Sequence, residues 1–382
     1  MPNNIEAIYA LGQSVWYDNI SRAMIDSGDL QHLINQGVTG LTANPTIFEK
    51  AISNSNDYDN QLMELALKNK SADEIYEELV IQDIRAAADL LLPVYNKTLA
   101  IDGYVSLEVS PRLAFDTSGT VEEARKFFNT LNRPNILIKV PATPQGIPAI
   151  QQLISEGINV NVTLIFSLDI YKQVQEAYIS GLEMLSSSSD DLSRVASVAS
   201  FFVSRVDTAV DEALTEKISQ GDSNLTSLMG KAAVANAKLA YRSFQQNFYS
   251  ERFNSLISKG AMVQRPLWAS TGTKNAGYSD VLYVDSLIGK STVNTMPDLT
   301  LAAFLDHGVP LATVTKDLAA AEQCIQGIIN SEVPLESITD KLLSDGVKAF
   351  SDSFESLMSH IETKRANLMA SHNKSGLANT GA

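Results

Sequence analysis

The sequence predicts a closed parallel (β/α)₈ barrel with a helical insertion after its second strand and a helical extension at its C-terminus. Three observations support this fold. Short strand-like runs alternate with helical patterns along most of the 382 residues. Eight such runs occur, which is the number needed to close the barrel. Polar residues also fall late in several of these runs, where barrel active sites are built. A doubly wound open sheet is the alternative, but it would leave strands unused.

The eight predicted strands are bounded by alternation of side chains and by β-branched enrichment. They cover residues 14–18, 40–44, 104–110, 135–141, 159–167, 198–205, 266–271 and 279–285. Helical patterns cover residues 21–36, 120–131, 147–155, 168–185, 227–259, 299–306 and 316–329. Two further helices, 45–67 and 72–95, form the insertion between the second and third strands.

The chain contains no internal repeat and no convincing interdomain linker, so we expect one barrel domain over residues 1–369, including C-terminal helix material at 338–369. Residues 186–191, a run of serines and aspartates, are expected to form an exposed loop. Residues 370–382 are polar and rich in small side chains, which predicts a disordered tail.

The net charge of −15, from 29 basic and 44 acidic side chains, argues against general binding of nucleic acid or of an anionic membrane. This net charge is still compatible with a small anionic substrate, because binding such a substrate needs only a few local cations. No apolar stretch approaches the ~20 residues that span a bilayer, and the N-terminal residues lack the basic region and apolar core typical of a signal peptide. The single cysteine, Cys324, excludes an intramolecular disulfide and favours a cytoplasmic location.

The histidines at 32, 307, 360 and 372 have no metal-ligand spacing, and neither a Gly-x-Gly-x-x-Gly motif nor a P-loop occurs. We therefore expect no metal and no cofactor. If the chain is an enzyme, its chemistry depends on side chains alone.

Lys139 is the most informative residue, because it interrupts the apolar run Ile136-Leu137-Ile138-Lys139-Val140-Pro141. Burying an unpaired ammonium costs several kcal/mol, and desolvation lowers the pKa of a lysine. A lysine with an increased neutral fraction suits Schiff-base chemistry on a carbonyl. The alternative is a lysine that extends to water or closes an ion pair. This strand alone does not decide between the two.

Alternation along the strands gathers polar side chains inside the barrel mouth. Apolar residues take the helix-facing side of the third, fourth and fifth strands, including Val160, Val162 and Leu164. The remaining parity turns polar residues inward, late in five strands: Asp18, Thr42, Asn44, Glu108, Lys139, Asn159, Asn161 and Thr163. A lysine beside carboxylates and hydroxyls has the parts needed for carbinolamine formation.

A basic and hydroxylic set follows on later strands. Ser200 and Arg205 are placed near the end of the sixth strand, and Ser270 and Lys274 after the seventh. Loops at this position commonly hold phosphate in barrels, and Arg or Lys with hydroxyls suits a phosphate monoester. The alternative for the arginine is a surface salt bridge to Asp207.

Several of these residues lie in segments that resemble the transaldolase family. The segments are Leu41-Thr42-Ala43-Asn44-Pro45-Thr46, Ile136 through Thr143 with Gly146-Ile147, Asn161 through Ser167, and Ser200 through Arg205. The match runs in order from about Asp18 to about Asp285, and Val293-Asn294-Thr295-Met296-Pro297 resembles the longer bacterial members.

The resemblance implies a cofactor-free transferase of the non-oxidative pentose phosphate pathway. A dihydroxyacetone unit would move from sedoheptulose 7-phosphate to glyceraldehyde 3-phosphate, giving erythrose 4-phosphate and fructose 6-phosphate. Lys139 matches the Schiff-base lysine, Asp18 the acid/base of carbon–carbon cleavage, and Glu108 with Thr163 the pair that holds a catalytic water. Matches to substrate contacts follow: Thr42, Asn44, Asn161 and Ser200 for the dihydroxyacetone hydroxyls, and Arg205 for the phosphate.

One loop departs from the family pattern. Shorter members carry an arginine soon after the serine of the seventh strand, whereas Ser270 is followed here by a longer loop ending in Lys274. A lysine offers a point charge without the bidentate geometry of arginine.

Two other functions stay open at this point. A fructose 6-phosphate aldolase would use the same lysine and release free dihydroxyacetone, although Glu108 in place of a glutamine favours the transferase. A non-catalytic barrel that binds sugar phosphates is the second, although Lys139, Asp18 and Glu108 are all present. The sequence is silent on oligomeric state, and a homodimer is left open.

Overall fold

The structure, a computed structural model, describes residues 2–379, with side chains described for residues 2–370. Eight parallel strands close a barrel in chain order, and β8 pairs with β1. This confirms the predicted (β/α)₈ fold. The strands are β1 Gln13–Tyr17, β2 Gly40–Thr42, β3 Tyr104–Glu108, β4 Ile136–Pro141, β5 Val160–Ile165, β6 Ser197–Phe202, β7 Arg265–Ala269 and β8 Thr292–Met296.

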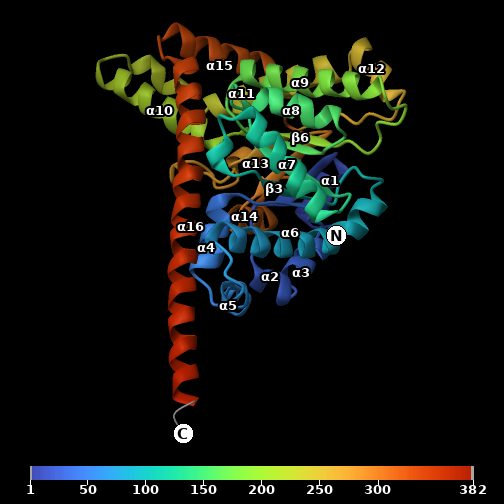
Figure 1. The fold of residues 1–382 in the computed structure, drawn as a ribbon. Helices are drawn as coiled ribbons and strands as arrows, with labels where there is room; N and C mark the ends of the chain where they lie inside the picture. Colours follow the sequence, from blue (N-terminus) through green and yellow to red (C-terminus); the bar gives the residue numbers. More distant parts are fainter. Residues whose placement is uncertain (1, 380–382) are drawn as a thin grey trace.

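Helices connect successive strands and surround the barrel (Figure 1). Up to β4 the helices are α1 Asn4–Ala10, α2 Arg22–Asp26, α3 Asp29–Asn35, α4 Pro45–Ser53, α5 Asp59–Leu67, α6 Ala72–Lys97, the 3₁₀ helix η1 Pro111–Leu113 and α7 Thr117–Leu131. From β4 onward they are α8 Gly146–Ser155, α9 Leu168–Ser186, α10 Ser204–Ser219, the 3₁₀ helix η2 Ser223–Leu228, α11 Ala232–Phe248, α12 Glu251–Ile257, α13 Leu282–Ser286, α14 Asp298–His307, α15 Leu318–Asn330 and α16 Leu335–Asn379.

The predicted eighth strand, residues 279–285, is wrong. This segment contains the short helix α13, and the eighth strand is β8, Thr292–Met296. Tyr283 and Val284 in α13 are buried. A short apolar run therefore marked core residues correctly but did not distinguish a strand from a helix, which periodicity cannot do over four residues.

The insertion between β2 and β3 contains three helices, where the sequence predicted two. The predicted helix 45–67 is divided at residues 54–58, a stretch of polar residues whose side chains compete with helical hydrogen bonds. A buried ion pair attaches this insertion to α2, because Arg22 donates to Asp83 Oδ1 at 2.8 and 2.9 Å. The Tyr58 hydroxyl donates to the other oxygen of Asp83 at 2.8 Å.

The C-terminal helix α16 runs alongside α4 and α5 and extends beyond them (Figure 1). Hydrogen bonds between Thr46 and Ser353 (2.8 Å) and from Lys364 to Asp59 (2.9 Å) hold it there. The helix continues to Asn379, into the range 370–382 for which the sequence predicts a disordered tail. Residues 380–382 lie outside the described part of the chain, so the domain boundary and tail stay predictions.

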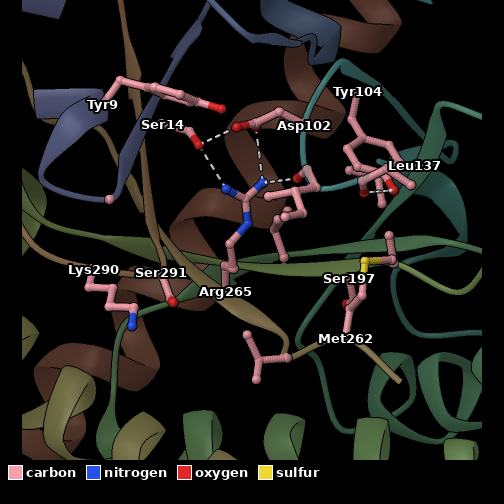
Figure 2. Close-up of a pocket in the computed structure, with 16 residues that line it drawn as sticks. Tyr9, Ser14, Asp102, Tyr104, Leu137, Ser197, Met262, Arg265, Lys290 and Ser291 are labelled. Carbon is pink, nitrogen blue, oxygen red and sulfur yellow. Dashed lines mark hydrogen bonds and ion pairs between the residues drawn. The ribbon is translucent and has the colours of Figure 1, made fainter. Parts of the chain in front are cut away.

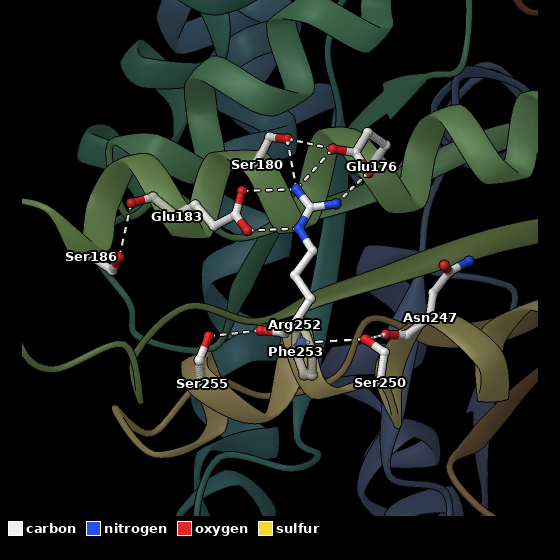
Figure 3. A network of polar contacts seen from close by, with 9 residues as sticks. All are labelled: Glu176, Ser180, Glu183, Ser186, Asn247, Ser250, Arg252, Phe253 and Ser255. Carbon is white, nitrogen blue, oxygen red and sulfur yellow. Dashed lines mark hydrogen bonds and ion pairs between the residues drawn. The ribbon is translucent and has the colours of Figure 1, made fainter.

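Arg252 connects α12 to α9 on the outer surface. Its guanidinium donates to both carboxylate oxygens of Glu176 and of Glu183 at 2.7–2.9 Å (Figure 3). The pKa values of Glu176 and Glu183 are lowered, mainly by these hydrogen bonds from Arg252. This network fixes the position of a short helix that has few residues of its own to bury.

A second charged cluster closes the amino-terminal end of the barrel. Arg265, at the start of β7, donates to Asp102 at 3.1 Å and to Ser14 at 2.8 Å (Figure 2). Trp16 Nε1 also donates to Asp102, at 2.9 Å. Asp102 is fully buried. The cluster borders a cavity of about 430 Å³. Residues at this end of a barrel usually serve stability, not catalysis.

Within residues 2–379, no helix combines the length and the apolar character needed to cross a bilayer.

Candidate active site

Lys139 lies on β4 with its side chain inside the barrel mouth, as the alternation predicts. It is paired in register with Glu108 on β3, is 4% exposed, and its Nζ lies 3.1 Å from Glu108 Oε2. Nζ also donates to the Ala43 carbonyl at 3.3 Å and lies 5.6 Å from the centroid of the Phe350 ring. The lysine therefore does not extend to water. Its ion-pair partner is the carboxylate of Glu108 on the neighbouring strand.

Burial affects the protonation of Glu108. Burial raises the pKa of Glu108, and the nearby Lys139 ammonium opposes the rise. A carboxyl group with a raised pKa is better suited to exchange protons near neutral pH than an ordinary glutamate is.

Asp18 follows the end of β1, and its backbone N–H donates to Met296 on β8. Thr42 donates to Asp18 Oδ1 at 2.7 Å, and Thr42 Oγ1 lies 2.7 Å from Thr295 Oγ1. Burial raises the pKa of Asp18, while Lys139, the Thr42 hydroxyl and Arg205 oppose the rise. This arrangement gives the site a second carboxyl group, held by a hydroxyl chain that crosses β1, β2 and β8.

Asn44 caps the N-terminus of α4. Its side-chain oxygen accepts from Ile47 N at 3.0 Å, and Pro45 occupies the first helical position, as is common. The cap orients the Asn44 amide so that its nitrogen is left as a donor at the cavity wall, where the residue lies.

Asn161 lies below the cavity and not on its wall. Its amide nitrogen donates to Ser106 at 3.0 Å, and its oxygen accepts from Ser200 at 2.7 Å. Ser200 does line the cavity. Asn161 thus orients Ser200, while its predicted direct contact with substrate stays a prediction. Asn159 lies deeper, with hydrogen bonds only to backbone atoms such as Ile136 O at 3.1 Å.

Thr163 reaches the cavity at a break in the strand alternation. The register of β5 shifts between Val162 and Ile165, and Leu164 has φ +59°, a conformation that costs a leucine energy. Leu164 was expected on the helix-facing side. Its side chain instead packs against Gly346 of α16, where an added Cβ would lie 2.9 Å from it. Thr163 Oγ1 is buried and has no hydrogen-bond partner in the described chain, which leaves it free to bind a water.

Arg205 is not in the sixth strand, which ends at Phe202, but in the first turn of α10. The salt bridge to Asp207, considered as the alternative, is absent: Asp207 accepts instead from Ala233 N at 2.7 Å and from the Tyr283 hydroxyl at 2.9 Å. The Arg205 guanidinium lies 5.4 Å from the Phe202 ring centroid.

Ser270 and Lys274 follow β7 at the same side of the mouth. Ser270 Oγ lies 2.9 Å from Ser204 Oγ, and its φ of +55° is a second unfavourable backbone conformation at the site. Within the part of the chain that the structure describes, no carboxylate is within ion-pair distance of Lys274 or Arg205. In a chain of net charge −15, such cations indicate an anionic ligand.

These residues surround a cavity of about 310 Å³ at the carboxyl ends of the strands, which we call the main cavity. This volume is at the lower end of the range of about 300–1,000 Å³ for small-molecule sites. The predicted residues on its wall are Asp18, Thr42, Asn44, Lys139, Thr163, Ser200, Arg205, Ser270 and Lys274. Glu108 contacts Lys139 from behind this wall.

Nine further lining residues were missed from the sequence, among them Lys50, Phe202, Thr295 and Phe350. Lys50 follows Thr46 by one helical turn on α4, so its spacing could have placed it on the same face. Thr295 was missed because β8 was misplaced. Phe350 lies in α16, and no local pattern tells which part of the barrel a distant helix covers.

Among the described residues, no group of three or more His, Cys, Asp or Glu side chains is placed to hold a metal ion. The side chains that line or border the main cavity supply an amine, two carboxyl groups, hydroxyls and cations.

Comparison with known proteins agrees with this geometry. A family model described as Transaldolase/Fructose-6-phosphate aldolase matches residues 15–361. The chain belongs to this family. A transaldolase from Saccharopolyspora erythraea is 47% identical over 358 residues, covering 93% of this chain and 96% of that protein. A transaldolase from Thiobacillus denitrificans is 46% identical over 360 residues, covering 94% and 99%.

A third relative, transaldolase 2 from Nostoc sp. strain PCC 7120, is 44% identical over 371 residues, covering 95% of this chain and 97% of the relative. The similarity to the family therefore includes the insertion α4–α6 and most of α16, and not only the barrel strands.

Proposed function

We propose that the protein is a transaldolase that transfers a dihydroxyacetone unit from sedoheptulose 7-phosphate to glyceraldehyde 3-phosphate through a Schiff base on Lys139. The products are erythrose 4-phosphate and fructose 6-phosphate. The observation that carries the proposal is the buried Lys139–Glu108 pair, 3.1 Å apart, beside a cavity that Asp18 lines.

In the proposed reaction Lys139 Nζ, as the neutral amine, attacks the ketone carbon C2 of the donor. The ketone oxygen takes up the proton that the amine nitrogen loses and becomes the carbinolamine hydroxyl. Glu108 protonates this hydroxyl, the C–O bond breaks, water leaves and the C=N bond of the imine forms. Thr163, whose hydroxyl is unpartnered in the described chain, would hold that water.

Asp18 then takes the proton of the C4 hydroxyl, and the C3–C4 bond breaks. The electron pair passes into the iminium ion, which becomes an enamine, and the aldose product leaves. In the second half of the reaction the enamine attacks the acceptor aldehyde, and Asp18 returns its proton to the new hydroxyl. Hydrolysis of the imine releases the ketose. The raised pKa of Asp18 supports its role as both base and acid.

Binding would divide between two sides of the main cavity. Thr42, Asn44 and Ser200, the last oriented by Asn161, are proposed to hold the dihydroxyacetone hydroxyls. Ser270 and three cations, Arg205, Lys274 and Lys50, would hold the phosphate, because none of these cations has an ion-pair partner in the described chain. The donor and the acceptor share a terminal phosphate, so one anion site serves both half-reactions.

Trapping with borohydride tests the proposal. The protein is incubated with fructose 6-phosphate, reduced, digested and mapped by mass spectrometry. A reduced three-carbon adduct on Lys139, absent in the Lys139→Ala variant, is expected. The absence of an adduct from folded protein at saturating donor would overturn the Schiff-base mechanism.

The family also includes aldolases, which release the three-carbon unit to water. Dependence on an acceptor separates the two activities. With fructose 6-phosphate alone, a transaldolase stops after one turnover, and erythrose 4-phosphate is needed as acceptor for further reaction. Steady release of free dihydroxyacetone would identify an aldolase.

A further inference from the structure

A second cavity, which we call the side cavity, lies on the far side of Glu108 from the main cavity. Its volume is about 210 Å³. It lies between β3, α6, α7, η1 and α16, and the residues relevant here are Tyr76, Glu108, Ser110, Leu113, Glu123 and Phe354. At the roughly 30 Å³ that each water occupies in the liquid, there is space for several water molecules.

Glu108 and Lys139 separate the two cavities. Lys139 and Thr163 line the main cavity, whereas Glu108 lines the side cavity. The two residues meet at the ion pair of 3.1 Å. Above them, Phe350 borders the main cavity and Phe354, one helical turn later on α16, borders the side cavity. The proton-exchanging carboxyl group is therefore accessible from the side that the sugar does not occupy.

The side cavity has the polar lining that ordered water requires. The Tyr76 hydroxyl makes no hydrogen bond to another described residue, although the residue is only 7% exposed. Both Glu108 and Glu123 act electrostatically on this hydroxyl. Glu123 accepts from Ser110 N at 2.5 Å, which fixes the chain two residues after Glu108. Because Tyr76 lines the side cavity and its hydroxyl has no partner in the described chain, water in the cavity can supply one.

The proposed reaction requires water to reach the imine carbon and to leave it. Each turnover releases one water when the imine forms and consumes one when the imine is hydrolysed. Both events occur while a sugar phosphate occupies a main cavity of only about 310 Å³. Water in bulk contact with the main cavity would also hydrolyse the imine before the acceptor arrives.

We propose that the side cavity is the route by which water reaches and leaves Glu108, with Tyr76 and Glu123 as positioning residues. This inference rests on the proposed Schiff-base function. On imine formation, the C2–O bond breaks, Glu108 donates its proton to the leaving hydroxyl, and the resulting water passes into the side cavity. On hydrolysis a water enters from the side cavity, Glu108 removes its proton, and the new C2–O bond forms. Tyr76 and Glu123 hold the neighbouring water molecules in position by hydrogen bonds.

Exchange of the ketone oxygen measures this step directly. Fructose 6-phosphate labelled with ¹⁸O at C2 is incubated with the full chain in ordinary water without acceptor, and loss of label is followed by mass spectrometry. Lys139→Ala supplies the background of spontaneous exchange. If the wild-type protein does not exceed that background, the proposed Schiff-base function fails, whatever the water route.

The blocking variant is Leu113→Trp, which fills part of the side cavity. Its matched control is Leu67→Trp, at a half-exposed leucine at the end of α5 that borders neither cavity. We expect Leu113→Trp to slow exchange about tenfold, the effect of about 1.4 kcal/mol on the barrier. The amount of imine trapped on Lys139 at equilibrium should stay at the wild-type level, because formation and hydrolysis slow together. Leu67→Trp should match the wild type in both measurements.

Tyr76→Phe and Glu123→Gln test the positioning residues without filling the cavity. Each is expected to slow exchange several-fold while leaving KM for fructose 6-phosphate unchanged, since neither residue borders the main cavity. A structural defect would instead change KM and the equilibrium imine level. Wild-type exchange rates in Tyr76→Phe and in folded Leu113→Trp would overturn the proposed route.

Discussion

Glu108 and Lys139 lie opposite each other on neighbouring strands, with Glu108 Oε2 3.1 Å from Lys139 Nζ and both side chains almost completely buried. Burying two charges costs several kcal/mol each, and their attraction offsets this cost only when the geometry is favourable. Oε2 has no aligned hydrogen bond in the described chain. The pair is therefore arranged for exchange of protons with a ligand, and not for stability alone.

Replacing Lys139 by alanine should abolish turnover, with a loss of at least about 10⁴-fold in kcat. The fold should survive, because Lys139 lowers the pKa of Glu108, and its removal lets Glu108 become protonated and neutral. Steady-state assays and circular dichroism check both parts. Lys172→Ala, at an exposed lysine on α9, is the control. Near-normal activity of Lys139→Ala would remove the Schiff-base claim.

Replacing Arg205 by alanine should raise KM for phosphorylated donors about 10- to 100-fold, the range expected for loss of a charged hydrogen bond. Its melting temperature should change little, since Arg205 has no ion pair in the described chain to lose. Arg194→Ala, at an exposed arginine before β6, should leave both quantities unchanged. Equal kinetics of Arg205→Ala on phosphorylated and unphosphorylated donors would contradict the phosphate assignment.

Asp18 should reduce stability at neutral pH. Its folded-state pKa is raised by burial above the ordinary value of 3.8, so the folded chain holds this proton more tightly than the unfolded chain. Stability from this group therefore falls as pH rises from the unfolded pKa through the folded pKa. Asp18→Asn should increase the melting temperature at pH 7 to 8, and this gain should vanish below about pH 4, where the wild-type carboxyl is also neutral.

Melting curves of Asp18→Asn and wild type between pH 4 and 8, at roughly unit intervals, provide the check. Asp340→Asn, at an exposed aspartate on α16, controls for the change in net charge. A stability gain that grows as pH falls would contradict the sign of the shift.

The Arg265–Asp102 cluster at the amino-terminal end of the barrel should affect the stability of the fold and not the catalytic rate. Arg265→Met leaves the carboxylate of Asp102 buried without its cation, which typically costs about 3–5 kcal/mol. Lys290→Met is the matched control, because Lys290 lines the same cavity but is exposed. Urea unfolding should separate the two variants, while kcat per folded molecule should be the same. A loss below about 1 kcal/mol in Arg265→Met would show that the pair is not structural.

The ion-pair network around Arg252 should contribute less to the free energy of unfolding than the Arg265–Asp102 pair does. Arg252→Met is expected to cost up to about 1 kcal/mol, because the carboxylates that it contacts are largely exposed and screened. The pKa values of Glu176 and Glu183 are lowered in the folded state, so this stability is present above their unfolded pKa values and is lost as pH falls through the folded ones.

Unfolding of Arg252→Met at two salt concentrations and at several pH values tests this assignment. The difference from wild type should shrink with salt and at low pH, whereas Arg194→Met should show little difference at any condition. A loss that is independent of salt would indicate packing of the arginine stem instead.

Much of the site follows from strand alternation. The inward positions of Glu108 and Lys139 could be predicted because a strand with an apolar helix-facing side leaves its other residues to the barrel interior. The prediction from alternation was wrong at Leu164, because a shift in the register of β5 turns that residue toward α16. The bend depends on contacts with a helix almost two hundred residues later, which no local pattern contains.

The sequence by itself determined the barrel, the insertion, the charge balance and the identity of the groups that carry the chemistry, since these depend on local periodicity and residue type. Only the tertiary structure decided that β8 is Thr292–Met296, that Arg205 lies in the first turn of α10, that Asn161 supports Ser200, and that α16 brings Phe350 over the site. It also placed Glu108 between two cavities. The physical reason is that cavities and long-range contacts arise from the packing of distant segments, which the pattern of any one segment does not encode.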